Sequence, residues 1–338
     1  MQSFRSLRRF SLSAALTVAS CPGVCAEAQE TKPPATAPAK TPAKPESTAA
    51  AIGSVTEPPD RTQPYSKAEL ELAANTLVTR DIKYAQSSGK GAELQVLDVY
   101  TPRGAAGLPV VVYVHGGGWS RGDKREVGAQ PKLFNENGVV LVAVNYRLSP
   151  EVKYPVHVSD IATGIAWVRA NIAQYGGDSN KLVVMGHSAG SHLASLVATH
   201  PDPLGKQGLK VSELKGAISL DGSGFNLVER FEARDPKASV AYERAFGTDK
   251  AVFADASPIQ HVKPGAKLPP FLLTYVKDGS VNHTQAAAFA KQIVANGGRA
   301  ELAFINGKDH ATLVADLGTE RDAAGTQILD FVRSVTAK

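Results

Sequence analysis

Runs of consecutive apolar residues recur along this chain of 338 residues and alternate with segments of helical periodicity. The runs cover residues 108–114, 139–144, 182–185, 217–220 and 271–275. Continuous apolar runs of this length are typical of strands buried on both faces of a parallel sheet. Residues 94–100 instead alternate apolar and polar side chains, as a half-exposed strand does, and a further strand is expected at residues 300–304.

Helical segments separate these strands. Ile161, Ile165 and Ile172 belong to a pattern that repeats every three or four residues, and two glycines at 176–177 end it. Other helical patterns cover residues 191–200, 285–295 and 326–335. The alternation predicts one open α/β sheet with helices on both faces.

The stretch from Phe225 to Val262 interrupts this alternation and carries aromatic residues among charged ones. We expect small cap helices there, in an insertion at about residues 223–263. They would lie over the carboxyl edge of the sheet, where open α/β sheets bind their ligands.

The first 60 residues differ from the rest. Three arginines at positions 5, 8 and 9 precede a mostly apolar stretch, residues 10–19, and small residues follow up to Ala26. This pattern predicts a secretory signal peptide over residues 1–26, because the apolar stretch is shorter than the roughly 20 residues of a membrane-spanning helix. The segment ending at Cys21 also resembles a bacterial lipoprotein box, so a lipid anchor at Cys21 is the alternative. Residues 27–60, rich in Pro, Ala, Lys and Thr, predict a disordered linker before a globular part at 61–338.

Charge and cysteine content exclude several classes of function. Without the three arginines of the predicted signal, the 37 basic residues fall to 34 and face 32 acidic ones, a net charge of +2. This balance gives no basis for a nucleic-acid partner. Both cysteines, Cys21 and Cys25, lie in the predicted signal. The rest of the chain therefore has no disulfide, cysteine nucleophile or thiolate metal site.

One pentapeptide, Gly186-His187-Ser188-Ala189-Gly190, follows a predicted strand and precedes a predicted helix. A Gly-x-Ser-x-Gly sequence in this position places its serine on a sharp turn where the hydroxyl is exposed. The glycines are needed because a side chain would crowd that turn. Ser188 is the candidate nucleophile, and His187 is expected to have a structural role.

A serine nucleophile needs a base, an acid that orients the base, and donors for the developing oxyanion. The donors are expected from residues 115–119 (HGGGW), since successive glycines leave backbone N–H groups open to a ligand. A phosphate loop is the alternative for this segment, but no Gly-Lys-Ser/Thr sequence follows it. His115 is expected to be a structural hydrogen-bonding residue and Trp119 to pack at the pocket wall.

The base and the acid are predicted from chain order, which runs Ser, Asp, His in this arrangement. His310 follows the last predicted strand and is the expected base, with His283 as its rival. Asp278, shortly after the strand at 271–275, is the expected acid. Asp221 is the alternative, since it also ends a strand between Ser188 and the base. Asp255 and Asp309 fit less well, because one lies in the cap and the other is adjacent to His310.

These segments resemble the α/β-hydrolase superfamily, and within it the esterases and lipases with a His-Gly-Gly-Gly donor loop. The resemblance covers about residues 80–335 and includes the segments 145–150 (NYRLSP), 166–168 (AWV) and 175–178 (YGGD). Hormone-sensitive-lipase-like members usually have Asp where this chain has His187. In this respect, and at Trp119, the chain is similar to relatives that include kynurenine formamidases and prenylcysteine methylesterases.

The resemblance implies a mostly parallel eight-stranded sheet with a small helical cap. It implies Ser188 as nucleophile with Asp278 and His310 as partners, and oxyanion donors at Gly117, Gly118 and Ala189. The function expected is an exported, periplasmic or secreted serine carboxylesterase for small or short-chain esters, without cofactor or metal. Two alternatives stay open: an arylformamidase-like amidase with the same triad, and a catalytically silent binding protein on the same fold.

Overall fold

The computed structural model describes the backbone of residues 75–233 and 236–337, and the side chains of all of these except 236–239. The predicted signal peptide, Cys21 and the predicted linker lie outside the described residues. So do residues 61–74, the first part of the predicted globular segment.

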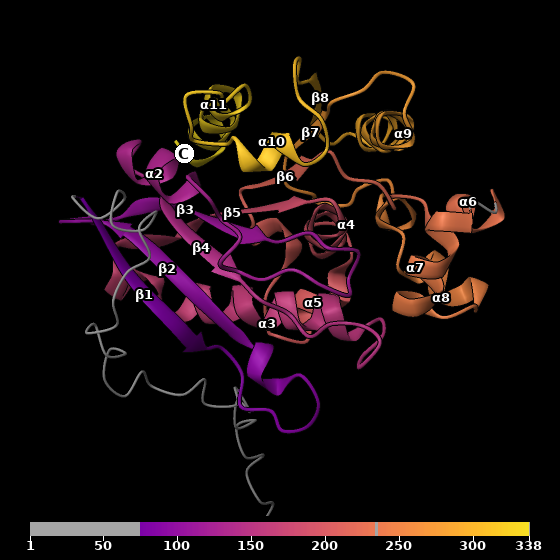
Figure 1. The fold of residues 1–338 in the computed structure, drawn as a ribbon, viewed down its shortest axis with the longest axis horizontal. Helices are drawn as coiled ribbons and strands as arrows, with labels where there is room; N and C mark the ends of the chain where they lie inside the picture. The colour runs from indigo at the N-terminus through magenta and orange to yellow at the C-terminus, as the bar shows by residue number, and fades with distance from the viewer. Residues whose placement is uncertain (1–74, 234–235, 338) are drawn as a thin grey trace, which may run out of the picture. The chain divides into compact units, whose positions relative to one another are not determined.

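Eight strands form one sheet, in the spatial order β1-β2-β4-β3-β5-β6-β7-β8 (Figure 1). Strands β1 and β4 both pair antiparallel with β2, and every other neighbouring pair is parallel. This confirms the predicted mostly parallel sheet. The strands are β1 (Thr76–Lys83), β2 (Val96–Pro102), β3 (Leu108–Val114), β4 (Val140–Val144), β5 (Gly177–His187), β6 (Gly216–Leu220), β7 (Phe271–Tyr275) and β8 (Ala300–Phe304).

Helices connect the strands and cover both faces of the sheet, as the alternation predicts. The α-helices are α2 (Gln130–Glu136), α3 (Val156–Asn171), α4 (Ala189–Val197), α5 (Pro201–Gly205), α6 (Leu227–Glu232), α7 (Pro236–Phe246), α8 (Lys250–Asp255), α9 (Val281–Ala295), α10 (Thr312–Ala315) and α11 (Gly325–Thr336). Short 3-10 helices are η1 (Ala92–Leu94), η2 (Ile172–Tyr175), η3 (Val211–Glu213) and η4 (Pro258–His261).

The buried strands contribute side chains to two cores, one on each face. Along β3, Val110, Val112 and Val114 belong to one core, and Val111 and Tyr113 belong to the other. This follows from the strand geometry, in which successive side chains point to opposite faces. Helices α3, α4 and α9 complete the first core, and α2 and α11 complete the second. A strand buried on both faces has no polar face, which explains the continuous apolar runs in the sequence.

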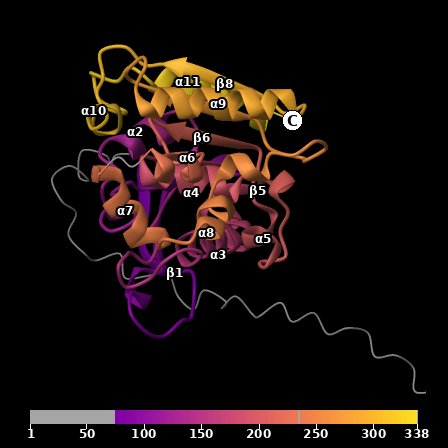
Figure 2. The ribbon, with the colours of Figure 1, turned by 90° about the vertical axis from the view of Figure 1, so that its right-hand side faces the viewer.

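The segment between β6 and β7 contains α6, α7, α8 and η4, where the sequence predicts cap helices. The three α-helices lie together beyond one end of the sheet, and Figure 2 shows them facing the viewer. Phe225, Phe246 and Phe253 of this segment are buried and extend the first core, and Phe231 is partly buried against it. We refer to α6, α7 and α8 as the cap.

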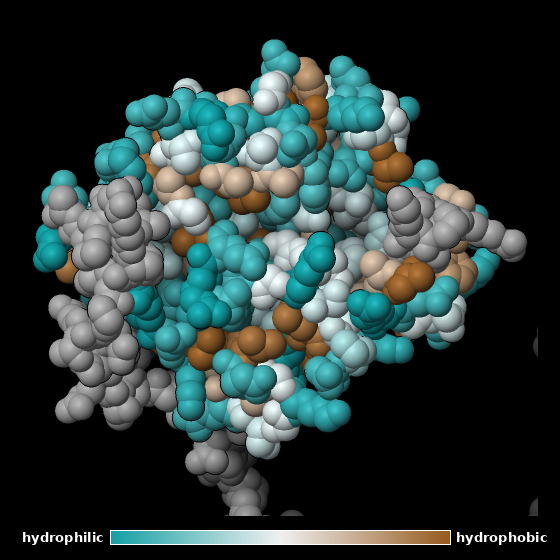
Figure 3. Space-filling model, in the orientation of Figure 1, coloured by the Kyte–Doolittle hydropathy of each residue, from teal (hydrophilic) through white to brown (hydrophobic). Residues whose placement is uncertain are grey.

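None of the described helices is both long enough and apolar enough to cross a membrane. On the face shown in Figure 3, hydrophilic residues predominate and apolar residues occur in small separate groups.

Candidate active site

Ser188 lies on a tight turn between β5, which ends at His187, and α4, which begins at Ala189. Its backbone has φ 56° and ψ −119°, a strained conformation for a residue with a side chain. The flanking glycines make the turn achievable. A Cβ on Gly186 would lie 2.1 Å from the carbonyl oxygen of Gly190, and one on Gly190 would lie 2.1 Å from that of Val114.

We expect Gly190→Ala to abolish activity and to destabilise the fold by more than about 3 kcal/mol, because the new methyl group would collide with backbone that cannot move cheaply. Gly205→Ala is the matched control, since Gly205 also lies in a helix and a Cβ there would meet nothing within 4 Å. Urea denaturation of both variants measures the difference. Equal stability of the two would contradict this account of the turn.

His310 links Ser188 to an aspartate. Its Nε2 lies 3.0 Å from Oγ of Ser188, and its Nδ1 lies 2.6 Å from Oδ2 of Asp221. His310 comes from the loop between β8 and α10, and Asp221 directly follows β6. With Nδ1–H donated to the carboxylate, Nε2 is left to accept the hydrogen of the serine hydroxyl. The structure thus brings together the predicted nucleophile and the predicted base.

Asp221 is held by several hydrogen bonds besides the one from His310. Its Oδ2 accepts from Nδ2 of Asn282 at 2.9 Å, and its Oδ1 accepts from the backbone N–H of Val276 at 3.3 Å. Burial alone would raise the pKa of Asp221, but the hydrogen bonds from His310 and Asn282 outweigh burial and hold it below its ordinary value. The carboxylate therefore stays charged beside the base.

The structure corrects the expectation that Asp278 orients His310, because Asp221 occupies that position. Asp278 lies beyond the end of β7, in the turn before α9, and its side chain is 72% exposed. Its carboxylate lies 3.7 Å from Nδ1 of His283. His283, the rival base, stacks on the ring of Tyr275 and accepts a hydrogen bond from the backbone N–H of Gly279 at 3.0 Å.

The predicted donor loop passes beside the nucleophile. A Cβ on Gly116 would lie 3.2 Å from Cβ of Ser188. The carbonyl of Gly117 accepts hydrogen bonds from the backbone N–H groups of Ser120 and Arg121, which closes a turn. Gly118 has φ 60° and open space where a Cβ would be. Ala189 is the first residue of α4, so its N–H has no acceptor within the helix.

Tyr146 packs on the donor loop, and the neighbouring Asn145 holds the residues that follow the loop. Asn145 accepts a hydrogen bond from the backbone N–H of Lys124 at 2.6 Å and donates to Asp123 at 3.1 Å. The ring of Tyr146 stacks on that of His115, with centroids 4.5 Å apart. His115 donates from Nδ1 to the carbonyl of Gly116 at 2.8 Å, in keeping with the structural role expected for it.

Trp119 connects the donor loop to the cap through His192, a residue that the sequence did not single out. Trp119 Nε1–H points at Nδ1 of His192 at 3.3 Å, and His192 Nε2–H donates to the carbonyl of Ala256 at 2.7 Å. Trp119 also packs against Phe246 and Tyr242. Both His192 and Trp119 are buried. The arrangement fixes the loop that follows the glycines relative to α8.

His187 supports the loop that carries the base. Its Nε2–H donates to the carbonyl of His310 at 2.8 Å, and the two rings lie 4.6 Å apart. The sequence predicted a structural role for His187 but could not show its partner, because the two residues are 123 positions apart.

Three buried histidines predict loss of stability in mild acid. Burial lowers the pKa of His157 to about 3 and that of His192 to about 4. For His187, burial and then the neighbouring His310 lower the pKa to about 4. Unfolded histidine binds a proton near pH 6.5, so between pH 6.5 and 4 the unfolded state binds more protons than the folded one.

The free energy of unfolding is therefore expected to keep its whole contribution from these histidines above about pH 6.5. As the pH drops toward 4, it should decrease by on the order of 3 kcal/mol for each of them. Urea midpoints measured from pH 7.5 to 4 test this. His192→Gln should flatten the profile, because it removes one of the three buried titrating rings. A constant midpoint over this interval would refute the prediction.

A model of the BD-FAE family matches residues 97–293 of the chain. Esterase LipC of Mycobacterium tuberculosis is 33% identical over 211 residues, which cover 59% of this chain and 52% of the relative. The isoprenylcysteine alpha-carbonyl methylesterase ICME of Arabidopsis thaliana is 32% identical over 232 residues, 64% of this chain and 54% of the relative. The chain spans about half the length of these curated relatives.

Solved structures share the fold. Esterase B of Lactobacillus rhamnosis, crystallised with an inhibitor, superposes with a TM-score of 0.67 at 24% identity, over 78% of this chain and 88% of the other. An esterase of Pyrobaculum calidifontis superposes with a TM-score of 0.61 at 26% identity, over 78% and 88% of the two chains. The sheet and the helices on its two faces therefore form an α/β-hydrolase fold.

Proposed function

Because this chain belongs to the BD-FAE family, we propose that it is a serine carboxylesterase that hydrolyses small or short-chain carboxylic esters through an acyl-enzyme. The observation that carries the proposal is the continuous hydrogen-bonded chain from Ser188 through His310 to Asp221, with distances of 3.0 and 2.6 Å. Esterases among the relatives and solved structures support the same chemistry.

In the proposed mechanism, Oγ of Ser188 attacks the carbonyl carbon of the ester while His310 Nε2 takes its proton. Asp221 holds His310 in the tautomer that leaves Nε2 free and stabilises the imidazolium that forms. His310 then protonates the departing alcohol. Water, activated by the same histidine, attacks the acyl-enzyme and releases the acid.

The backbone N–H groups of Gly117, Gly118 and Ala189 are the proposed oxyanion donors. The passage of the donor loop beside Ser188 and the free first turn of α4 support this role. Fixed donors of this kind contribute on the order of 10²–10³ in rate each. Trp119, held by His192 and the cap, would keep the glycines in place when the substrate binds.

The preference for short acyl groups is proposed from the packing around the donor loop. There the rings of Tyr242 and Phe246 pack against Trp119 and occupy space that a long acyl chain would need. A series of p-nitrophenyl esters from acetate to dodecanoate tests it. We expect the highest kcat/KM at two to four carbons and a decline of at least about tenfold by eight carbons. A maximum at long chains would overturn the preference while leaving the esterase assignment intact.

The competing function is an arylformamidase-like amidase, which would use the same three side chains. The signal peptide predicted over residues 1–26 supports a periplasmic or secreted protein, away from the cytoplasm where formyl-aryl amides are mostly found. Comparison of a formylated aryl amine with phenyl acetate separates the two. We expect the ester to be the better substrate, and a higher kcat/KM for the formamide would favour the amidase.

A further inference from the structure

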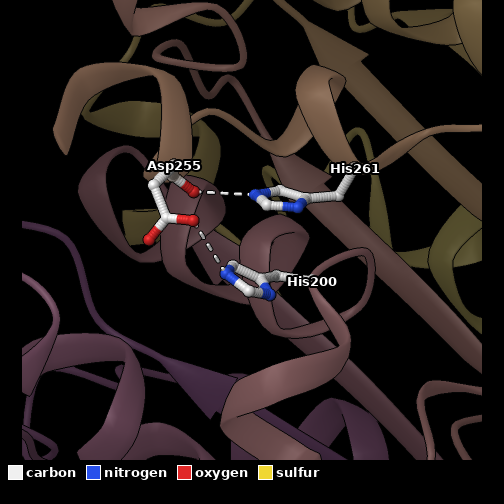
Figure 4. Close-up of side chains that lie close together, drawn as sticks. All are labelled: His200, Asp255 and His261. Atoms are coloured by element: carbon white, nitrogen blue, oxygen red, sulfur yellow. Dashed lines mark hydrogen bonds and ion pairs between the residues drawn. The ribbon is translucent and has the colours of Figure 1, made fainter. Parts of the chain in front are cut away.

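A second cluster of titratable side chains joins the cap to the core, apart from Ser188 and its partners. His200 lies between α4 and α5, Asp255 ends α8, and His261 ends η4. One ligand atom from each lies within 4.8 Å of the other two. Figure 4 shows both imidazole rings directed at Asp255. We call this the His-Asp-His cluster, and it is the one group of three or more metal-ligating side chains among the described residues.

Each histidine of the cluster interacts with Asp255. Nε2 of His200 lies 3.2 Å from Oδ1 of the carboxylate, and Nε2 of His261 lies 2.7 Å from the backbone carbonyl. The two rings stack with centroids 3.9 Å apart. Two imidazole nitrogens and one carboxylate oxygen are a ligand set that suits Zn²⁺.

The carboxylate also has an outer partner of the kind found behind metal ligands. The hydroxyl of Tyr154 donates to Oδ2 of Asp255 at 2.6 Å, on the oxygen that does not face His200. Such a bond orients the carboxylate and leaves its other oxygen for an ion. Asp255 is exposed and His261 is partly exposed, so an ion and a completing water can reach the cluster from solvent.

We propose that the His-Asp-His cluster binds one divalent transition-metal ion, best matched by Zn²⁺, which fastens the cap to the core. The ion takes the place of the hydrogens that both Nε2 atoms now direct at Asp255, and the proton of each neutral ring moves from Nε2 to Nδ1. The ring of His261 turns out of its stack to direct Nε2 at the ion, for which its partial exposure leaves room.

Binding has a further local cost at His200. Nδ1 of His200 accepts a hydrogen bond from the backbone N–H of Asp202 at 3.2 Å, which caps the five-residue helix α5. That bond is lost when Nδ1 carries the proton. In return, the ion joins residues from the core and from both ends of the segment Asp255–His261. Because Ala256 in this segment accepts the hydrogen bond of His192, the ion would also steady the support of Trp119.

Titration of ZnCl2 into the full-length, EDTA-treated protein at pH 7.5, followed by calorimetry, tests the proposal. We expect the wild type to bind one more ion per chain than Asp255→Asn or His261→Gln, and its melting temperature to rise with that ion. Tyr154→Phe should weaken the site about 10- to 100-fold. His283→Gln is the matched control, since His283 faces only one carboxylate, that of Asp278, and should bind as the wild type does.

The comparison between variants removes the contribution of any other metal ligand in the full chain, since all variants share those ligands. Cobalt(II) provides a readout that needs no variant, because a four-coordinate site of nitrogen and oxygen ligands gives strong visible absorption at one equivalent. Equal zinc binding by the wild type, Asp255→Asn and His261→Gln would overturn the proposal. So would the absence of binding by the wild type up to about 0.1 mM zinc.

Discussion

Ser188→Ala is expected to lower kcat for p-nitrophenyl acetate by on the order of 10⁶-fold, because the proposed mechanism has no covalent step without the serine hydroxyl. The change removes one oxygen atom and leaves the backbone of the turn unaltered, so the melting temperature should stay close to that of the wild type. A residual rate above that of water is also expected, since the backbone donors remain in place.

Steady-state kinetics of Ser188→Ala, with active-site titration to exclude traces of wild-type enzyme, provide the measurement. Retention of more than a hundredth of the wild-type rate by a folded variant would place the nucleophile elsewhere.

Asp221→Asn is expected to lower kcat by about 10⁴-fold with little change in KM, since an amide presents the wrong partner to Nδ1 of His310 and favours the wrong tautomer. Asp278→Asn is the matched control, because this carboxylate is exposed in the turn before α9. It should retain kcat within about twofold. Both variants replace one carboxylate oxygen by an amide nitrogen. The ratio of their kcat values therefore reports only the difference in position of the two side chains.

Circular dichroism and the melting temperature of Asp221→Asn separate a catalytic loss from a loss of structure, since Asp221 also accepts hydrogen bonds from Asn282 and Val276. A larger fall in kcat for Asp278→Asn than for Asp221→Asn would reverse the assignment of the acid.

Much of the fold could be predicted from the sequence because the central strands are buried on both faces and therefore apolar throughout. The predicted strands at 108–114 and 271–275 coincide with β3 and β7. Strand β1 was missed, because this edge strand mixes exposed and buried residues and contains Arg80, Asp81 and Lys83. The extent of β5 before Leu182 was missed for a similar reason, as its first residues are polar.

The acid of the site could not be decided from chain order. Asp221 and Asp278 both follow parallel strands between Ser188 and His310, and parallel strands end at the same edge. The difference between them is local: Asp221 directly follows the last residue of β6, with φ 44°, whereas Asp278 lies three residues beyond β7. The distance of each aspartate from the end of its strand was the signal available in the sequence. A side chain directly at the strand end is held by the sheet, whereas one in the following turn is free to face solvent.

The other site contacts that the sequence could not predict join segments that are far apart in the chain. His192 joins the donor loop to the cap, across 73 residues on one side and 64 on the other. His187 reaches the carbonyl of His310 in a similar way. Neither partner leaves a periodic pattern in the chain, so only the folded arrangement reveals them.

Covalent labelling of Ser188 tests the central claim most directly. The wild-type protein is treated with a fluorophosphonate, and the modified peptide is identified by mass spectrometry. The proposed mechanism predicts one adduct per chain, on Ser188, with loss of esterase activity in proportion to labelling and no adduct in Ser188→Ala. An active wild-type protein that forms no adduct, or one whose adduct lies on another residue, would contradict it.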